Sequence, residues 1–417
     1  MQAADRLRLQ RALVWLCRII VGLTFVISGW AKAIDPWGTL IKVEEYLTVW
    51  GLSLPRELTL TGCIALACIE FCTGVLVATG ALRRLSVITA GLIMLFMLPL
   101  SLYIAIANPV TDCGCFGDFI ILSNGATFAK NVVLAALIAY LIIKNTTIKG
   151  LYAPPIQWLE IAVSLAFPLL LAFYGYNIQP MLDFRTYKIG TGLFAASEGV
   201  TGEKYIYEKD GERRSFDLAE LPDSSWSFVD MEMPEADNRA GFEILDEDGE
   251  DVSEDLAARG GEMLLLVVPD PGVQFLSRAH LTNELYRYSA HHGVDMVAIV
   301  GETGPSLERW KDLTYPRFPV YSATSTALKQ LVRGDAALVY TIDGEIKWKR
   351  TLASLPPDIV TDTDASGNML RNVRPVDDGR LHTVLASAWL VSMLIIYLLS
   401  LSPKILRCFV RQTKKNA

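Results

Sequence analysis

Six long apolar runs, separated by shorter polar segments, dominate the pattern of the chain. A helix needs about 20 predominantly apolar residues to cross the hydrocarbon core of a bilayer. The runs that approach this length are Ala12–Ala33, Leu58–Gly80, Leu85–Ala107, Ala126–Ile143, Ile156–Tyr176 and Thr383–Ser402. The first run resembles a secretory signal, but its length and its polar Arg18 and Lys32 favour an uncleaved span. The pattern therefore predicts six membrane-spanning helices.

Lysine and arginine in the short loops predict the orientation of these spans, because cytoplasmic loops carry an excess of basic residues. Basic residues collect on one side, at positions 6–11, 83–84, 144–149 and 404–415. On the other side, the loop at 34–57 has mixed charge and the loop at 108–125 has no basic residue. We therefore expect a bacterial inner-membrane protein with both termini in the cytoplasm and residues 177–381 in the periplasm.

The outer segment has the pattern of a soluble α/β domain. Strand-like runs at residues 205–211 and 242–249 end in Asp-Gly turns, which is a hairpin signal. Two continuous apolar runs, Met263–Val268 and Val294–Val300, have the length of buried strands. The other expected elements are helices over 275–288, 306–313 and 325–332 and a closing hairpin over 337–340 and 345–348. This order, β-α-β-α-β-β, is thioredoxin-like.

The predicted fold class is a membrane all-α protein with a four-helix bundle, plus fifth and sixth spans that flank a periplasmic α/β domain. The expected parts are the four-helix membrane domain (1–150), the fifth transmembrane helix (151–177), a linker and β-hairpin region (178–240), a thioredoxin-like domain without a Cys-x-x-Cys motif (241–381), and the sixth helix with a basic cytoplasmic tail (382–417).

Composition agrees with a membrane protein and excludes several classes. Apolar residues make up 52% of the chain and charged residues 20%, which argues against a wholly cytosolic enzyme. The formal charge of -7 argues against a nucleic-acid partner, which would need a basic surface. Seven cysteines in 417 residues are too sparse for a secreted disulfide scaffold. The expected partners are the lipid bilayer and a periplasmic protein.

The most informative motif is Cys113-Gly-Cys115, in the outer loop between the third and fourth spans. These are the only two cysteines predicted outside the membrane and the cytoplasm. Residues two apart can approach the Cα separation that a disulfide needs, and the small ring would be strained and labile. A redox-active pair is therefore one interpretation and a structural turn disulfide is another. A metal site is a third, although two thiolates without a nearby histidine leave zinc short of ligands.

Ionisable residues inside apolar spans are candidates for function, because burying a charge in a membrane is expensive. Depth along the helices predicts that Glu70 pairs with Arg18, in a buried ion pair that fixes the register of the first two spans. Lys32, Asp35 and Lys130 are expected near the outer surface, as is the cysteine pair. A lysine near a cysteine lowers the pKa of its thiol. Alternatively, both lysines extend to lipid headgroups.

The four histidines all follow residue 279, so the membrane domain has no axial ligand of the type that haem most often uses. By elimination, a diffusible quinone is the expected acceptor if electrons leave the cysteine pair.

The membrane domain resembles DoxX-like and MauE-like membrane proteins over about residues 10–145. The matching positions are Arg18, Ser28–Lys32, Asp35–Gly38, Lys42–Tyr46, Glu70, Gly74, Gly80, Asp112–Asp118 and Thr127–Asn131. The resemblance implies a four-helix membrane bundle. MauE proteins are linked to disulfide formation in a periplasmic methylamine dehydrogenase subunit, and DoxX proteins to quinone-linked sulfur oxidation. The resemblance also adds Asp118 to the residues that are expected to support the cysteine pair.

The outer domain resembles thioredoxin-like proteins of the TlpA or peroxiredoxin type, with two departures. Where the family has its cysteine motif, after the first core strand, this chain has Pro269–Gly272. The cis-proline position of the family holds Ala336. We therefore expect a domain that binds a partner, shields the pair or only keeps the fold, and does not exchange disulfides.

Two functions remain open. In the first, Cys113 and Cys115 exchange disulfides with thiols of envelope proteins, and the electrons pass to quinone. In the second, the protein is a non-enzymatic scaffold whose outer domain binds an envelope protein and whose cysteine pair is structural.

Overall fold

The computed structural model describes residues 3–110, 112–193, 204–209, 212–217, 227–232, 243–271, 278–301, 304–355, 359, 367–373 and 378–413. The chain divides into two compact units. The first combines Met1–Phe184 with Val376–Ala417, and the second is Arg185–Pro375. The boundaries predicted from the sequence, after residues 150, 177, 240 and 381, stay predictions.

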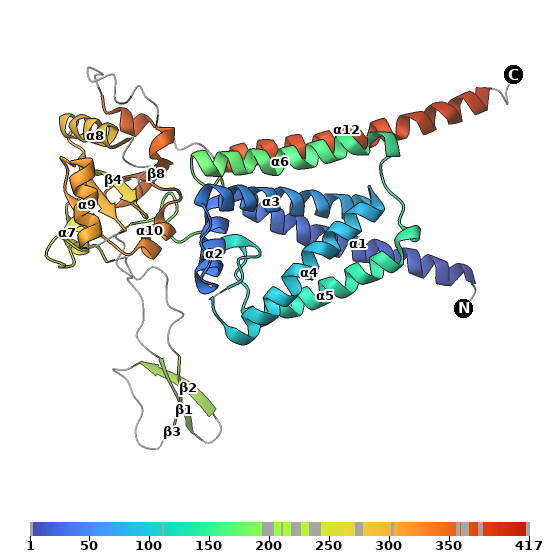
Figure 1. Ribbon diagram of the computed structural model, residues 1–417, viewed down its shortest axis with the longest axis horizontal. Helices are drawn as coiled ribbons and strands as arrows, with labels where there is room; N and C mark the ends of the chain where they lie inside the picture. Colours follow the sequence, from blue (N-terminus) through green and yellow to red (C-terminus); the bar gives the residue numbers. More distant parts are fainter. Residues whose placement is uncertain are drawn as a thin grey trace. The chain divides into compact units, whose positions relative to one another are not determined.

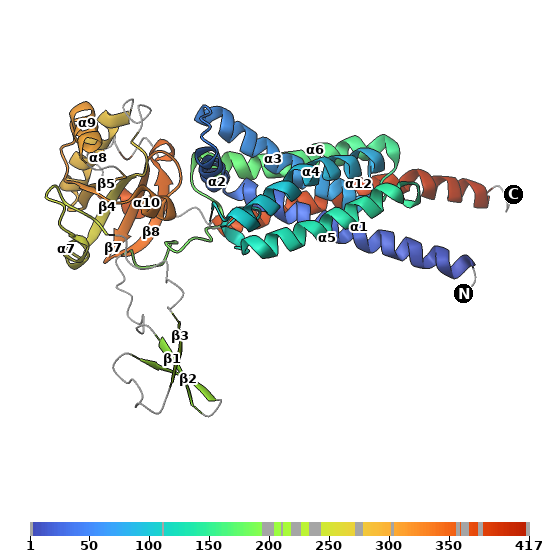
Figure 2. The same ribbon diagram turned by 60° about the horizontal axis from the view of Figure 1, so that its bottom comes forward.

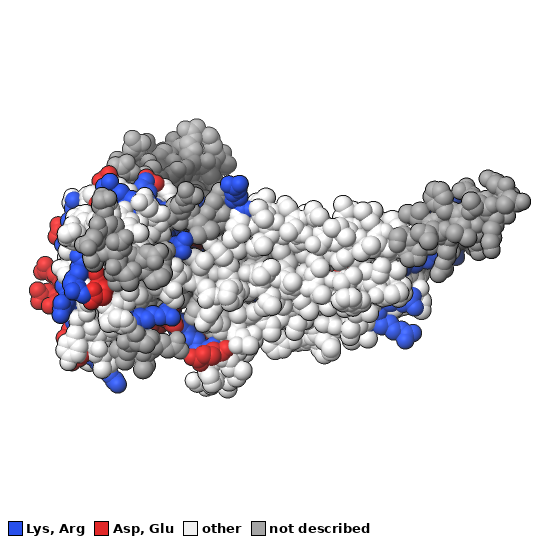
Figure 3. Space-filling view, turned by 90° about the horizontal axis from the view of Figure 1, so that it is seen from above, with Lys and Arg blue, Asp and Glu red and all other residues white. Residues whose placement is uncertain are grey.

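The first unit is a bundle of helices (Figures 1 and 2). Its helices are α1 (Ala3–Ile34), α2 (Pro36–Val49), α3 (Arg56–Thr79), α4 (Arg83–Ala107), α5 (Asn124–Ile143), α6 (Gln157–Asn177) and α12 (Asp378–Thr413). Six of them, all except α2, are long and apolar enough to cross a membrane, which agrees with the six predicted spans. Their exposed surface in Figure 3 is a long uncharged belt, as expected for contact with lipid.

Helices α1 and α3 pack in direct backbone contact because glycines line the seam. A Cβ atom added to Gly29 would lie 2.4 Å from the backbone nitrogen of Phe71, and one added to Gly74 would lie 2.6 Å from the carbonyl oxygen of Gly22. Small residues allow this close approach in membrane helices. The contacts fix which residues of α1 and α3 lie at the same level, and so they position the polar side chains described below.

Helix α2 was missed by the sequence analysis, which treated residues 34–57 as a loop. It begins where Asp35 caps the helix by accepting a hydrogen bond from the backbone nitrogen of Gly38 at 2.8 Å, and Pro36 occupies its first turn. Its 14 residues make it about 21 Å long, too short to span a bilayer. Trp37 anchors it by stacking on Tyr176 of α6, with ring centroids 5.4 Å apart.

The second unit contains a mixed five-stranded sheet of order β6-β5-β4-β7-β8. Strands β4 (Glu262–Val268), β5 (Asp295–Val300) and β6 (Val320–Ser322) are parallel. Strand β7 (Ala337–Ile342) pairs antiparallel with β4, and β8 (Glu345–Thr351) pairs antiparallel with β7. The helices are α7 (Ser253–Ala258), α8 (Ala279–His291), α9 (Pro305–Thr314) and α10 (Ser325–Leu331). The thioredoxin-like assignment of this sheet stays a prediction.

Strand β4 is at the centre of the sheet because nearly all its residues are apolar. Leu264, Leu266 and Val268 face the cluster that includes α8 and α9, while Leu265 and Val267 face the cluster that includes α7 and α10. Two predicted details differ from the structure. The short strand β6 was not predicted. The described part of the second hairpin run, residues 243–249, forms bridges at Leu245 and a turn instead of a strand, and Phe242 lies outside the described residues.

A separate three-stranded antiparallel sheet has the order β2-β1-β3. Its strands are β1 (Lys204–Lys209), β2 (Glu212–Asp217) and β3 (Ser227–Glu232). The antiparallel pairing of β1 with β2 confirms the predicted hairpin pairing, and the Asp-Gly turn expected at 210–211 lies outside the described residues.

Candidate functional site

The cysteine pair lies on the segment between α4 and α5, at the end of the first unit where α2 packs. Cys113 and Cys115 are both free and half-buried, and their sulfur atoms are 2.7 Å apart. The backbone nitrogen of Cys115 also points at the sulfur of Cys113, at 3.2 Å. Gly114 supplies the required bend, with a positive φ of 64° that disfavours other residues. The local backbone therefore holds the two sulfurs together even without a covalent bond.

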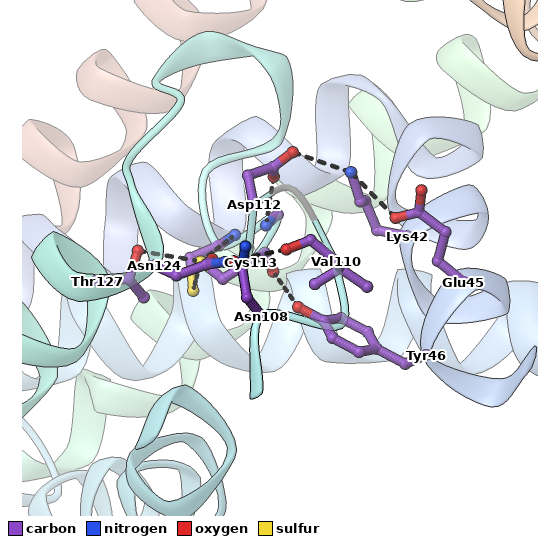
Figure 4. Close-up of polar contacts among 11 residues, drawn as sticks. Lys42, Glu45, Tyr46, Asn108, Val110, Asp112, Cys113, Asn124 and Thr127 are labelled. Atoms are coloured by element: carbon purple, nitrogen blue, oxygen red, sulfur yellow. Dashed lines mark hydrogen bonds and ion pairs between the residues drawn. The ribbon is translucent and has the colours of Figure 1, made fainter. Parts of the chain in front are cut away.

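Side chains of helix α2 bind this segment from one side, as Figure 4 shows. The carboxylate of Asp112 accepts a hydrogen bond from the backbone nitrogen of Gly114 at 2.8 Å, and its other oxygen lies 2.9 Å from the ammonium of Lys42. Tyr46 donates its hydroxyl to the carbonyl oxygen of Cys113 at 3.2 Å. Lys42 also lies 3.1 Å from Glu45, one turn along α2. An otherwise irregular loop is thus fixed directly beside the two sulfurs.

The two ends of the same segment are tied together by Asn124, at the start of α5 (Figure 4). Its amide nitrogen donates to the side-chain oxygen of Asn108 at 2.6 Å and to the carbonyl oxygen of Val110 at 2.9 Å. The hydroxyl of Thr127, one turn into α5, lies 3.5 Å from the sulfur of Cys113. The loop is therefore closed at its base and touches α5 at the reactive atom.

A buried polar network holds the other side of the pair. The ammonium of Lys32 lies 2.7 Å from the Glu70 carboxylate and 2.8 Å from the carbonyl oxygen of Cys115. The hydroxyl of Ser28 lies 2.7 Å from Lys32 and 2.8 Å from both the Glu70 carboxylate and the same carbonyl. Lys32 is 5% exposed and Glu70 3%, so water does not screen the charges. The network connects α1 and α3 directly to the backbone of Cys115.

The predicted pairing of Glu70 with Arg18 is wrong. Glu70 pairs with Lys32, and Arg18 caps the opposite end of α3. The guanidinium of Arg18 donates to the carbonyl oxygens of Val77 at 3.0 Å, Ala78 at 2.9 Å and Lys149 at 3.1 Å. The Val77 and Ala78 carbonyls are unsatisfied acceptors in the last turn of α3, where a cation is favourable, and the Lys149 carbonyl belongs to the connection before α6. The role of Arg18 is therefore to fix the end of α3, far along the helix from Glu70.

The other predicted residues divide between those near the pair and those that serve the helices. Lys130 on α5 lies 4.4 Å from the centroid of the Phe116 ring, the residue that follows Cys115. Asp35 caps α2. Asp118 is half-buried in η1 (Gly117–Phe119), on the segment just beyond the pair. Lys32 and Lys130 thus remain the candidates for charges that act on the sulfurs.

The two thiols have unequal proton affinities. The hydrogen bond from Cys115 is the main cause that lowers the pKa of Cys113 to about 6, against the effect of burial. The Thr127 hydroxyl and the charge of Lys130 lower this pKa further. The same hydrogen bond, followed by burial, raises the pKa of Cys115. Near neutral pH the reduced pair therefore shares one proton, and Cys113 is the thiolate.

An apolar cavity of about 190 Å³ lies against the pair. The cysteines, Gly114, Lys32 and Asn131 line one part of it. The rest is lined by α2, α4 and one residue of α3, and it is almost entirely apolar. A smaller space of about 30 Å³, beside Ser28, Glu70 and Lys130, has room for about one water molecule. The sulfurs are therefore next to a space with the character of a site for an apolar ligand.

Several residues of the site were not identified from the sequence. Lys42 and Tyr46 were recognised only as part of a family resemblance, and Ser28 likewise, without any role at the cysteines. The signal that could have placed α2 there is the Asp35-Pro36 pair, since Asp before Pro marks a helix start. Within the described residues, no group of three or more His, Cys, Asp or Glu side chains could hold a metal ion.

Comparison with known families matches two parts of the chain. Residues 10–144 match the family model described as methylamine utilisation protein MauE. That segment contains both cysteines and all the residues of the network around them, so this part of the molecule is similar to the MauE family. Residues 204–234, which include the strands β1, β2 and β3, match a domain of unknown function (DUF8463). No curated protein matches the chain.

Proposed function

We propose that this membrane protein is a thiol–disulfide oxidoreductase whose Cys113–Cys115 pair oxidises thiols of envelope proteins. The observation that carries the proposal is the geometry of the pair, in which two free sulfurs lie 2.7 Å apart and one of them has a lowered pKa. A disulfide bond is about 2.05 Å long. A small movement of either side chain would therefore make or break the bond.

The proposed reaction follows ordinary thiol–disulfide exchange. A client thiolate attacks the oxidised pair, the bond between the two sulfurs breaks, and a mixed disulfide forms with one cysteine. The other cysteine leaves as a thiolate. Cys113 is the better leaving group because its pKa is lower, so the mixed disulfide forms at Cys115. A second client thiolate then releases the client disulfide, and the pair has gained two electrons.

The pair then needs a two-electron acceptor before it can act again. The acceptor predicted from the sequence is a quinone of the bilayer. The surrounding contacts support repeated cycling, because Asp112, Tyr46 and Lys32 all bind backbone atoms of the loop and none of them bonds a sulfur. The loop can thus keep its position while the sulfur chemistry changes.

The location and client belong to the same proposal. We infer that the pair lies on the periplasmic side of a bacterial inner membrane, as the basic loops predict. The second unit has no cysteine, since none occurs between Cys115 and Cys408. Its mixed sheet is compatible with a thioredoxin-like domain that holds a client without exchanging disulfides. The description of the matched family suggests a client that takes part in methylamine utilisation.

The test is oxidation of a reduced two-cysteine peptide by the full-length protein in lipid nanodiscs. The protein is first oxidised with diamide, and the peptide disulfide is measured by chromatography. We expect both Cys113→Ser and the double variant Cys113→Ser with Cys115→Ser to be inactive, because neither can form the disulfide that accepts two electrons from the peptide. Cys63→Ala is the matched control, because Cys63 is buried on α3 outside the pair. Full peptide oxidation by the double variant would show that the pair is structural.

A further inference from the structure

The cavity beside the cysteine pair extends from the sulfurs towards α4. Beyond the two cysteines, its wall is built from apolar side chains of α2 and α4, among them Val43, Leu47, Phe96 and Ile104. Such a wall does not favour the binding of water-soluble thiols, because their polar groups would lose hydration there without forming hydrogen bonds. The cavity therefore suits a ligand that reaches the pair from an apolar environment.

A second hollow, of about 280 Å³, lies on the outer face of α4 and shares Trp50, Phe96 and Leu100 with the first. Its other lining residues include Leu95, which is 72% exposed. Phe96, common to both spaces, is 61% exposed. Because α4 is a membrane-spanning helix, exposed apolar side chains on it face lipid. The two spaces are therefore adjacent, separated only by side chains that they share, and the outer one lies on the lipid-facing side of α4.

Asn131 of α5 supplies a polar group to this apolar site. Its side chain is 3% exposed and lines the cavity at the end where the cysteines lie. Among the described residues, its amide nitrogen donates one hydrogen bond, a long contact of 3.5 Å to the carbonyl oxygen of Met97. A buried amide has two N–H donors, and leaving one unused costs free energy. Asn131 is therefore suited to donate a hydrogen bond to a ligand oxygen.

We propose that this cavity binds the ring of a membrane quinone, which enters from the lipid between α2 and α4 and leaves its tail in the outer hollow. The proposal rests on the redox function proposed above. A volume of about 190 Å³ is below the roughly 300–1,000 Å³ of sites for drug-sized ligands and fits a single substituted ring. The hydrocarbon tail of a lipid could fill the same space, but it has no oxygen to accept a hydrogen bond from Asn131, and it accepts no electrons.

The proposed step balances without another reagent. The thiol of Cys115 and the thiolate of Cys113 give up two electrons and form the bond between their sulfurs. The quinone takes up these two electrons and becomes the quinol. Of its two protons, one comes from Cys115 and one from water. The cavity of about 30 Å³ beside Lys130 and Ser28 provides a place for such a water next to the pair.

The experiment uses the full-length protein, reduced and then freed of reductant, in nanodiscs of phosphatidylethanolamine and phosphatidylglycerol. Decylubiquinone is added without oxygen, and quinol formation is followed by absorbance. Leu100→Trp fills the junction of the two spaces and should lower the rate about tenfold or more at low quinone concentration. Asn131→Ala should raise the quinone concentration needed for half-maximal rate. Leu92→Trp is the control, because Leu92 lies on α4, is 61% exposed and lines neither space.

Oxidation of the same samples by diamide separates the two proposals. We expect diamide to oxidise the pair equally in the wild type, Leu100→Trp and Leu92→Trp, and we expect all three to have the same thermal unfolding temperature, which shows that the variants are folded. If diamide oxidises the pair but decylubiquinone does not, or if Leu100→Trp reacts as fast as Leu92→Trp, the quinone site is wrong and the exchange function stands. If diamide cannot close the pair in the wild type, the proposed function itself fails.

A photoreactive azidoquinone provides a second measurement that does not depend on turnover. We expect cross-links to peptides from α2 and α4, and we expect decylubiquinone to suppress them in competition. Cross-links spread over all the lipid-facing helices, with no competition, would mean that the quinone is only dissolved in the bilayer and would overturn the site.

Discussion

The ammonium of Lys32 lies 2.7 Å from the carboxylate of Glu70, and both side chains are almost fully buried between α1 and α3. The same ammonium holds the carbonyl oxygen of Cys115 at 2.8 Å. An ion pair at membrane depth thus serves as the support of the cysteine loop. The charge of Lys32 is partly offset by Glu70, whereas Lys130 on α5 lowers the pKa of both cysteines and forms no ion pair within the described part of the chain.

Removing one member of this pair should be costly. Glu70→Gln leaves the Lys32 charge buried without its partner, and breaking a buried ion pair in this way costs about 3–5 kcal/mol. We expect a large drop in the thermal unfolding temperature of the detergent-solubilised protein. Glu45→Gln breaks the half-exposed pair with Lys42 and should cost less than about 1 kcal/mol. Equal effects of the two substitutions would contradict a structural role for the buried pair.

The lowered pKa of Cys113 predicts the pH dependence of its reactivity. A thiolate is the reactive form, so its fraction grows as pH rises through the pKa. In the fully reduced protein, alkylation of Cys113 by iodoacetamide should reach half its maximal rate near pH 6, rather than at about 8.5 as for an ordinary cysteine. Mass spectrometry of the labelled peptide measures this rate at each pH.

Two substitutions separate the causes of that low pKa. Cys115→Ala removes the thiol that donates to Cys113, which is the main cause, and should move the midpoint of alkylation well upwards. Lys130→Gln removes a smaller electrostatic contribution and should move it upwards by less. If Lys130→Gln had the larger effect, the charge on α5 and not the neighbouring thiol would control the reactivity of Cys113.

The glycine seam between α1 and α3 can be tested with matched alanine substitutions. Gly29→Ala would force a Cβ to within 2.4 Å of the Phe71 backbone, and overpacking of this kind costs about 1–3 kcal/mol. Gly62→Ala, on α3, meets nothing within 4 Å and gains about 0.8–1.0 kcal/mol of helix propensity. Thermal unfolding should therefore shift in opposite directions. A downward shift for both would mean that glycine flexibility, and not close packing, matters.

Membrane orientation is testable by labelling single cysteines introduced into a background without the native pair. Ile121→Cys lies on the loop of the pair and is 70% exposed, and Thr146→Cys lies on the opposite side of the predicted membrane. An impermeant maleimide should label position 121 in intact spheroplasts and position 146 only after lysis. The reverse pattern would place the pair in the cytoplasm and remove the basis for oxidising envelope proteins.

Much of the architecture follows from patterns that are local in the sequence. Six spans could be predicted because each is a continuous apolar run, and strands such as β4 because their residues are apolar without interruption. The pairing of charges could not be obtained in this way. A depth for Glu70 that is counted from Leu58, as if the membrane began there, places it near Arg18. The first turns of α3 instead pack beside α2. The register of α1 against α3 depends instead on glycine contacts such as Gly29 with Phe71.

In the candidate site, too, the features that are local in the sequence could be predicted and those that depend on helix packing could not. Cys113 and Cys115 stand out by their spacing and by the absence of other cysteines nearby in the chain. Their partners come from four separate segments, namely α1, α2, α3 and α5, and no spacing rule connects Tyr46 or Glu70 with residue 113. The cavity is further removed from the sequence, because its shape depends on how α2 and α4 pack around Trp50 and Leu100.

The aliphatic chain of Lys42 lies over Gly114, so that a Cβ added there would come within 3.0 Å of its Cγ. Gly114 is consequently restricted in two ways. Its positive φ disfavours other residues, and the side chain of Lys42, which is paired with Asp112, leaves no room for a Cβ atom. Replacing Cys-Gly-Cys with a longer motif, such as the Cys-x-x-Cys motif of other oxidoreductases, would require α2 to move away from the loop. Helix α2, which the apolar pattern did not predict, therefore limits which residues, and how many, can stand between the two cysteines.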